Sequence, residues 1–146
     1  MIRELEYSQG ATLLLSSFQS LEFALKIHIA TSYAIIRHKL GGVIPFNYSY
    51  QTVKHFPLER LLSVFAQLNA NSDLQRRLNK LREHRNHAAH QALLLRHESI
   101  RSILNEDFEQ TKEEMASALM ELEQCLVELA NELESVFQIH AGLSEA

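Results

Sequence analysis

MASALMELEQCLVELANELESV, residues 115–136, is the most regular stretch of the chain. Its large apolar residues recur at alternating steps of four and three, which places them on one face of a helix, with acidic residues on the other. The apolar series is Met115, Leu119, Leu122, Leu126, Leu129, Leu133 and Val136. We therefore expect a long helix that starts at Asn105 or Asp107 and ends just before Gly142. Its apolar stripe either packs inside the chain's own core or joins a second chain.

The N-terminal part of the chain predicts a second long helix. It runs from near Leu5 or Gly10 to Leu40, and the glycine pair 41–42 ends it, as glycine does just past a helix C-terminus. Its apolar face is formed by Leu14, Phe18, Leu21, Leu25, His28, Ser32 and Ile35. Residues 43–56 then read as a loop that is longer than a typical connection between helices.

Two more helices are expected between this loop and the C-terminal helix. Residues 57–68 begin with a proline, which suits the first turn of a helix, and continue with an apolar face. Asn71 or Ser72 caps the next helix, which fades between residues 89 and 96. Residues 99–104 form one helical turn or two.

These patterns together predict an all-α fold. No strand pattern or internal repeat is found, and the four glycines and two prolines favour long uninterrupted helices. We expect one domain over residues 1–146, built as an antiparallel bundle of four to five helices with a loop at about 41–56. The lone Cys125 is interpreted as a small buried apolar residue and excludes an intramolecular disulfide. With no secretory leader and no apolar run of transmembrane length, a cytoplasmic location without membrane contact is expected.

Arg85 interrupts the apolar face of the third helix. The face steps by four and three residues through Leu74, Leu78, Leu81, Arg85, Ala88 and Ala92. A leucine would be expected at position 85, and a guanidinium that cannot lose its charge needs an anionic partner if it is buried there. That partner is either a carboxylate or a bound phosphate. Glu22 is the obvious carboxylate, because apolar residues of the first helix flank it.

The residues Arg85-Asn86-x-x-Ala89-His90 resemble the Arg-x4–6-His motif of the HEPN superfamily. This resemblance implies a small helical bundle and, as in many HEPN domains, a metal-independent ribonuclease of a toxin–antitoxin or phage-defence system. It also implies a homodimer in which both copies of the motif line one cleft. The substrate would be RNA, with no DNA binding expected, and an antitoxin protein is a further possible partner.

Each motif residue has a side chain that suits metal-free RNA cleavage. Arg85 would bind the scissile phosphate, and His90 would act as general base or acid, leaving a 2′,3′-cyclic phosphate. Asn86 would donate a hydrogen bond or orient His90 from one turn earlier. Glu22, His84 and His87 are assigned supporting roles, with Glu22 holding the guanidinium in place. An ion pair with no catalytic role is the alternative for Arg85.

Arg85 and His90 stand five residues apart, about 140° around an ideal helix. They can meet only if the arginine wraps round, if the helix distorts, or if two chains contribute jointly. We therefore predict a symmetric dimer in which Arg85, Asn86 and His90 of both chains line one cleft. Glu22 should lie within hydrogen-bonding reach of Arg85 or of a motif histidine.

The sequence lacks two features: the tyrosine that one HEPN branch has after its motif, and an arrangement of histidines that suits a metal ion. In the branch partnered with nucleotidyltransferases the motif continues His-x-Tyr, whereas Ala92 stands at the tyrosine position here, so adenylylation there is impossible. His84, His87 and His90 are spaced three apart, but successive steps of three rotate around a helix and converge poorly on zinc. We expect neither a metal nor another cofactor.

Charge is segregated along a chain whose net charge is −4. Residues 76–101 hold seven arginines and lysines against two glutamates, and residues 102–146 hold eleven acids against one lysine. The basic segment is interpreted either as a solvated helix face or as a local anion-binding strip. The acidic segment and its leucine stripe also allow a function of another class, a non-catalytic helical module for dimerisation or protein binding, like an antitoxin or a regulator.

Overall fold

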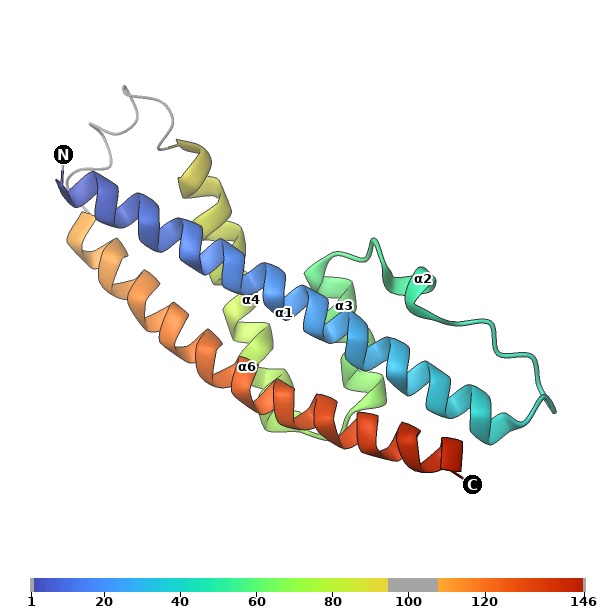
Figure 1. The fold of residues 1–146 in the computed structure, drawn as a ribbon. Coiled ribbons are helices and arrows are strands. Elements are labelled where there is room, and N and C mark those ends of the chain that lie inside the picture. The colour runs from blue at the N-terminus through green and yellow to red at the C-terminus, as the bar shows by residue number, and fades with distance from the viewer. Residues whose placement is uncertain (1, 95–107, 146) are drawn as a thin grey trace.

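The structure, a computed structural model, describes the backbone of residues 2–94 and 108–145, with side chains over most of 9–86 and 113–143. The predicted all-α fold is confirmed over these ranges. The helices are α1 (Ile2–Leu40), α2 (Tyr50–Val53), α3 (Leu58–Leu68), α4 (Ser72–Leu94) and α6 (Phe108–Glu145) (Figure 1). The expected turn at 99–104 and the expected helix starts Asn105 and Asp107 lie outside the described residues. No helix in the described part of the chain is long and apolar enough to cross a membrane.

The long helices do not alternate strictly in direction. Gly10 lies against Met115, and further along the same two helices Asn69 bridges His28 and Glu132, so α1 and α6 run the same way (Figure 1). The pairing of α4 with each of them is antiparallel. The expectation of an entirely antiparallel bundle is therefore corrected for α1 and α6, which share the most extensive helix–helix contact.

The direction of α3 explains the long connection after α1. An ion pair between Arg82 and Glu59, 3.4 Å, ties the first turn of α3 to the middle of α4, so the two helices form an antiparallel hairpin. Because α4 is antiparallel to α1, α3 follows the direction of α1, and the chain must return along α1 before α3 begins (Figure 1). The return segment was expected to be loop throughout, but it contains the single turn α2. In that turn the Ser49 amide donates to Thr52 Oγ1 at 3.0 Å, a hydrogen bond characteristic of a capping box.

The predicted C-terminal ends of α1, α3 and α4 are confirmed, whereas α1 begins at Ile2 and not near Leu5 or Gly10. Gly41 and Gly42 terminate α1 with φ of 57° and 82°, values that only glycine adopts without strain. Asn71 caps α4, because its Oδ1 accepts the Leu74 amide at 3.1 Å. The expectation at Gly142 is wrong, since α6 continues through it to Glu145. A glycine near the C-terminus of a helix weakens it by only ~1 kcal/mol and does not have to end it.

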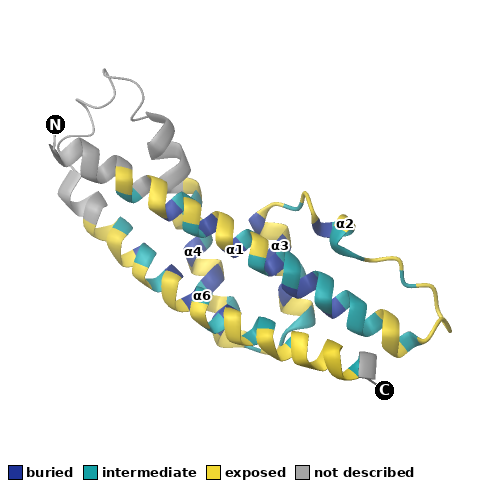
Figure 2. Cartoon of the chain, in the orientation of Figure 1, coloured by how far each residue is buried: buried dark blue, intermediate teal, exposed yellow. Residues whose placement is uncertain are grey.

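The core lies between α1, α3, α4 and α6 (Figure 2). On α1 it follows the predicted face, except that Ile35 is only partly buried. On α6 the buried line is shifted toward α4. Ala118 and Cys125 are fully or almost fully buried, whereas Leu119 and Leu126 of the predicted stripe pack at the edge. The α6 face turned to the core is therefore wider than the leucine series, and small residues occupy its centre.

Candidate functional site

Arg85 and Glu22 form the contact that the sequence predicts. Arg85 Nη2 donates to Glu22 Oε1 at 3.2 Å across the α1–α4 interface. Burial is less complete than expected for a residue on the apolar face of α4, because 40% of the Arg85 side chain and 19% of the Glu22 side chain are exposed. A long arginine can pack its methylene stem against the core while its guanidinium reaches the surface. The guanidinium is therefore held by one carboxylate oxygen and still open to solvent.

The other candidate residues are spread around α4. Asn86 and His84 are exposed, and the side chains of His87 and His90 lie outside the described residues. The backbone of α4 is α-helical without a break from Ser72 to Leu94, so the helix does not distort between Arg85 and His90. Their positions in one chain remain about 140° apart. Among the residues whose side chains the structure describes, the predicted contact that is present is the one between Arg85 and Glu22.

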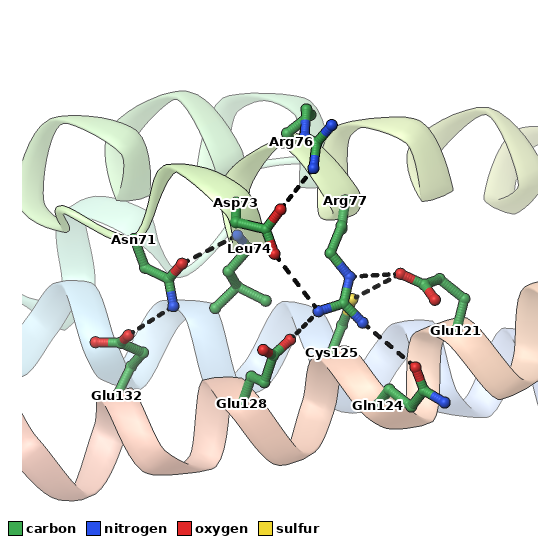
Figure 3. Close-up of polar contacts among 10 residues, drawn as sticks. All are labelled: Asn71, Asp73, Leu74, Arg76, Arg77, Glu121, Gln124, Cys125, Glu128 and Glu132. Carbon is green, nitrogen blue, oxygen red and sulfur yellow. Dashed lines mark hydrogen bonds and ion pairs between the residues drawn. The ribbon is translucent and has the colours of Figure 1, made fainter.

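The basic segment is neutralised by α6 where the structure describes it. Arg77 points from α4 to α6, where its Nε donates to Glu121 Oε1 at 2.6 Å and its Nη1 to Glu128 (Figure 3). Gln124 Oε1 lies 3.5 Å from the third nitrogen, Nη2. A hydrogen bond to Glu121 raises the pKa of Arg77, and the neighbouring carboxylates add to the effect. The Arg77 guanidinium therefore uses its hydrogen-bond donors on side chains of α6, and they are not available to a ligand.

The other arginines in the described part of this segment, up to Arg85, are paired as well. Arg76 contacts Asp73 at 2.5 Å, Arg82 contacts Glu59, and Arg85 contacts Glu22. Lys80 is the basic residue without an ion pair to any described residue. Of the two interpretations of residues 76–101, the described part does not favour an anion-binding strip, because carboxylates on α1, α3, α4 and α6 pair with its arginines.

A surface cleft of about 580 Å³ lies between α4 and α6. On the α4 side it is lined by Arg76, Arg77, Lys80, Leu81 and His84, and on the α6 side by Glu113, Glu114, Ser117, Ala118 and Glu121. His84, an expected supporting residue, therefore lies in a cleft whose two walls carry opposite charge. An anion there would meet the α6 carboxylates as well as the cations, so the cleft does not favour a phosphate.

A buried polar network not predicted from the sequence joins α1, α6 and the α3–α4 turn. His28 is fully buried, its Nε2 lies 3.4 Å from Asn69 Nδ2, and its Nδ1 has no partner within the described residues. Glu132 accepts from Asn69 at 3.0 Å and from Asn71 at 2.9 Å. Burial lowers the pKa of His28, and Glu132 partly opposes this. The only signal in the sequence was a polar histidine within an apolar face.

No group of three metal-binding side chains is found among the described residues. Cys125 is buried as predicted, and burial raises its pKa to about 11, so it is not a reactive thiolate. Comparisons of the chain with known protein families, curated proteins and solved structures find no match.

Proposed function

We propose that this chain is a metal-independent endoribonuclease of the HEPN type that acts in a defence or toxin–antitoxin system. The observation that carries the proposal is Arg85, in the Arg-x4-His sequence, held by Glu22 and yet 40% exposed. A guanidinium in this state is positioned by a carboxylate and keeps hydrogen-bond donors available for a phosphate.

In the proposed reaction the RNA 2′-hydroxyl attacks the adjacent phosphorus and the bond to the 5′-oxygen breaks. His90 takes the 2′-proton or returns a proton to the leaving oxygen, because its ordinary pKa of about 6.5 suits both steps. Arg85 stabilises the negative charge that builds up on the phosphoryl oxygens. The products are a 2′,3′-cyclic phosphate and a 5′-hydroxyl. Asn86 orients the phosphate or His90.

The proposed active site is shared by two chains. Arg85 and His90 lie on an undistorted helix at positions about 140° apart, so one copy alone is a poor site. In a two-fold dimer Arg85 of one chain serves the same phosphate as His90 of the second. Each chain supplies both residues, so a dimer holds two equivalent half-sites around one axis.

The test is cleavage of a labelled RNA by the purified protein in EDTA. Arg85→Ala and His90→Ala should each slow cleavage by about 10²–10⁴-fold, the usual contribution of such groups. Arg82→Ala is the matched control, since Arg82 is also ion-paired on α4 and should cleave at the wild-type rate. Absence of cleavage by the wild type, or equal rates for all variants, would refute the proposal. A mixture of Arg85→Ala and His90→Ala chains should recover part of the activity if the site is shared.

A non-catalytic protein-binding module is the second candidate. Met120 and Val127 favour it, because these side chains lie two turns apart on α6 and are 63% and 64% exposed. Apolar side chains repeated at seven residues on an open helix face can receive a second helix. Met120→Glu and Val127→Glu should then abolish assembly with an antitoxin-like protein, whereas Arg85→Ala should not. Assembly that survives both α6 substitutions would exclude this candidate.

A further inference from the structure

The segment around the long connection carries unopposed positive charge. No aspartate or glutamate occurs between Glu22 and Glu59, whereas lysine or arginine occurs at positions 26, 37, 39 and 54. Arg37 and Lys39 lie in the exposed last turn of α1, and Lys54 is exposed just after α2. None of these cations forms an ion pair with a described residue. This end of the molecule therefore presents positive charge that is not neutralised within the described chain.

Three aromatic rings lie together at the same end. Tyr33 of α1 lies 5.7 Å from Phe46 and 5.6 Å from Tyr48, and the last two rings are 5.2 Å apart, measured between centroids. These are the distances of edge-to-face and tilted aromatic pairs. Tyr48 is 53% exposed, so its ring is supported from behind and open to solvent in front. A half-exposed ring that its neighbours hold in place can stack with a planar ligand.

Two arginines connect the charge to the rings. Arg37 Nη1 donates to the backbone carbonyl of Tyr48 at 3.2 Å, so a guanidinium contacts the residue that carries the exposed ring. Arg60 of α3 lies over the ring of Phe56, 3.9 Å from its centroid. The pKa of Tyr33 is raised by burial and by Tyr48, and Arg60 opposes this, so Arg60 is also close to the aromatic cluster. Arg37 and Arg60 thus each contact an aromatic residue of the segment 43–56.

We propose that this aromatic–cationic surface, formed by Tyr33, Arg37, Phe46, Tyr48 and Arg60, binds single-stranded RNA. Bases stack on Tyr48, and Arg37 and Lys39 neutralise the phosphates. The choice of RNA rests on the proposed function. Tyr33 is eleven residues from Glu22 on α1, about 17 Å along the helix at ~1.5 Å per residue. The surface is thus a second substrate contact, separate from Arg85.

Charge favours RNA over a protein occupant. Val43 and Ile44, which precede Phe46 in the sequence, are exposed and would suit an apolar partner. A protein partner, however, would have to be acidic as well as apolar, whereas a single strand carries both bases for the rings and phosphates for the unopposed cations. Every base has a face that can stack, so little sequence preference is expected.

The experiment measures binding of a fluorescently labelled oligouridine by anisotropy, in full-length protein that carries Arg85→Ala so that the RNA stays intact. Tyr48→Ala should weaken binding by about 5- to 100-fold, the usual loss for one base–aromatic stack. Tyr48→Phe keeps the ring and should bind within twofold of the parent. The double variant Arg37→Gln, Lys39→Gln should reduce the slope of log affinity against log salt by about 1.4, at ~0.7 per phosphate.

The charge-matched control is the double variant Arg76→Gln, Lys80→Gln in the α4–α6 cleft, which should bind within twofold of the parent. The proposal is overturned if Tyr48→Ala binds RNA as tightly as Tyr48→Phe. It is also overturned if the double variant of Arg76 and Lys80 loses as much RNA affinity as the double variant of Arg37 and Lys39. Circular dichroism checks that each variant keeps its helices. If the wild type cleaves RNA but Tyr48→Ala binds RNA as tightly as the parent, this proposal is wrong and the proposed ribonuclease function is unaffected. Tyr48-dependent binding without cleavage would support it and refute the ribonuclease.

Discussion

The α4–α6 side and the aromatic end of the molecule differ in what surrounds their cations. On α4 the arginines are numerous, but Glu121 and Glu128 of α6 and the acids of other elements pair with them. At the aromatic end the cations are fewer, and Arg37, Lys39 and Lys54 form no ion pair with a described residue. Charge density along the chain is therefore a poor guide to an anion-binding surface. What decides it is whether acidic side chains of a neighbouring helix lie close enough to pair with the cations.

The largest expected effect tests the packing that places the acids of α6 beside α4. Leu129 is fully buried, and Leu129→Ala should lower the free energy of unfolding by about 2–5 kcal/mol, through lost burial and a cavity. Val127→Ala, two residues away but exposed, should change it by less than ~0.5 kcal/mol. Urea denaturation measures both. Equal losses would mean that α6 packs in another register, and the pairing described for Arg77 would then not hold.

Substitution of Arg77 on α4 and of Arg37 at the aromatic end should differ in their effect on the stability of the fold. Arg77→Ala leaves Glu121 and Glu128 facing each other without a cation and should destabilise the fold more than any other arginine substitution on α4. Arg37→Ala, where no carboxylate is left behind, should leave the urea midpoint unchanged. The additional substitution of Glu128→Gln should recover part of the loss in Arg77→Ala by removing the repulsion. If Arg77→Ala and Arg37→Ala shift the urea midpoint equally, the proposed difference between the two regions is wrong.

His28 extends the comparison to the interior of the molecule, where burial disfavours the positive charge of the imidazole. Burial lowers its pKa below the usual value of about 6.5, and Glu132 is the charged group that faces it, from α6. Because the unfolded chain takes up this proton more readily, stability should fall as the pH drops below about 6.5. His28→Phe should flatten this part of the pH profile. A profile that keeps its slope in His28→Phe would contradict the assignment.

The smallest expected effect on stability is that of replacing the glycine just after α1, where the connection to the aromatic end begins. Gly42 has a φ of 82°, so Gly42→Ala should cost about 1 kcal/mol or more through backbone strain. Gly142 is helical with open space around it, so Gly142→Ala should raise stability by up to ~1 kcal/mol. Opposite shifts in the thermal midpoint are the expected result. Shifts of the same sign would indicate that the turn after α1 is not held as described.

Several features follow from the sequence because they are local. The helical periodicity depends on residues within two turns, so the apolar face of α1 and the existence of α6 could be predicted. The end of α1 at Gly41 and the cap at Asn71 depend on one residue each. The Glu22–Arg85 contact was also predictable, because each residue stands where an apolar one would be expected and each requires a partner of opposite charge.

The tertiary structure decided which helices face one another. The parallel course of α1 and α6, the burial of Ala118 and Cys125, and the pairing of Arg77 depend on residues far apart in the sequence. The aromatic cluster likewise required the return of residues 41–56 along α1. The sequence by itself determined each helix and its apolar face, since these depend on neighbouring residues. Only the packing of the helices determined which charges are neutralised and which stay open, because Coulomb interactions depend on distance in space and not on position in the chain.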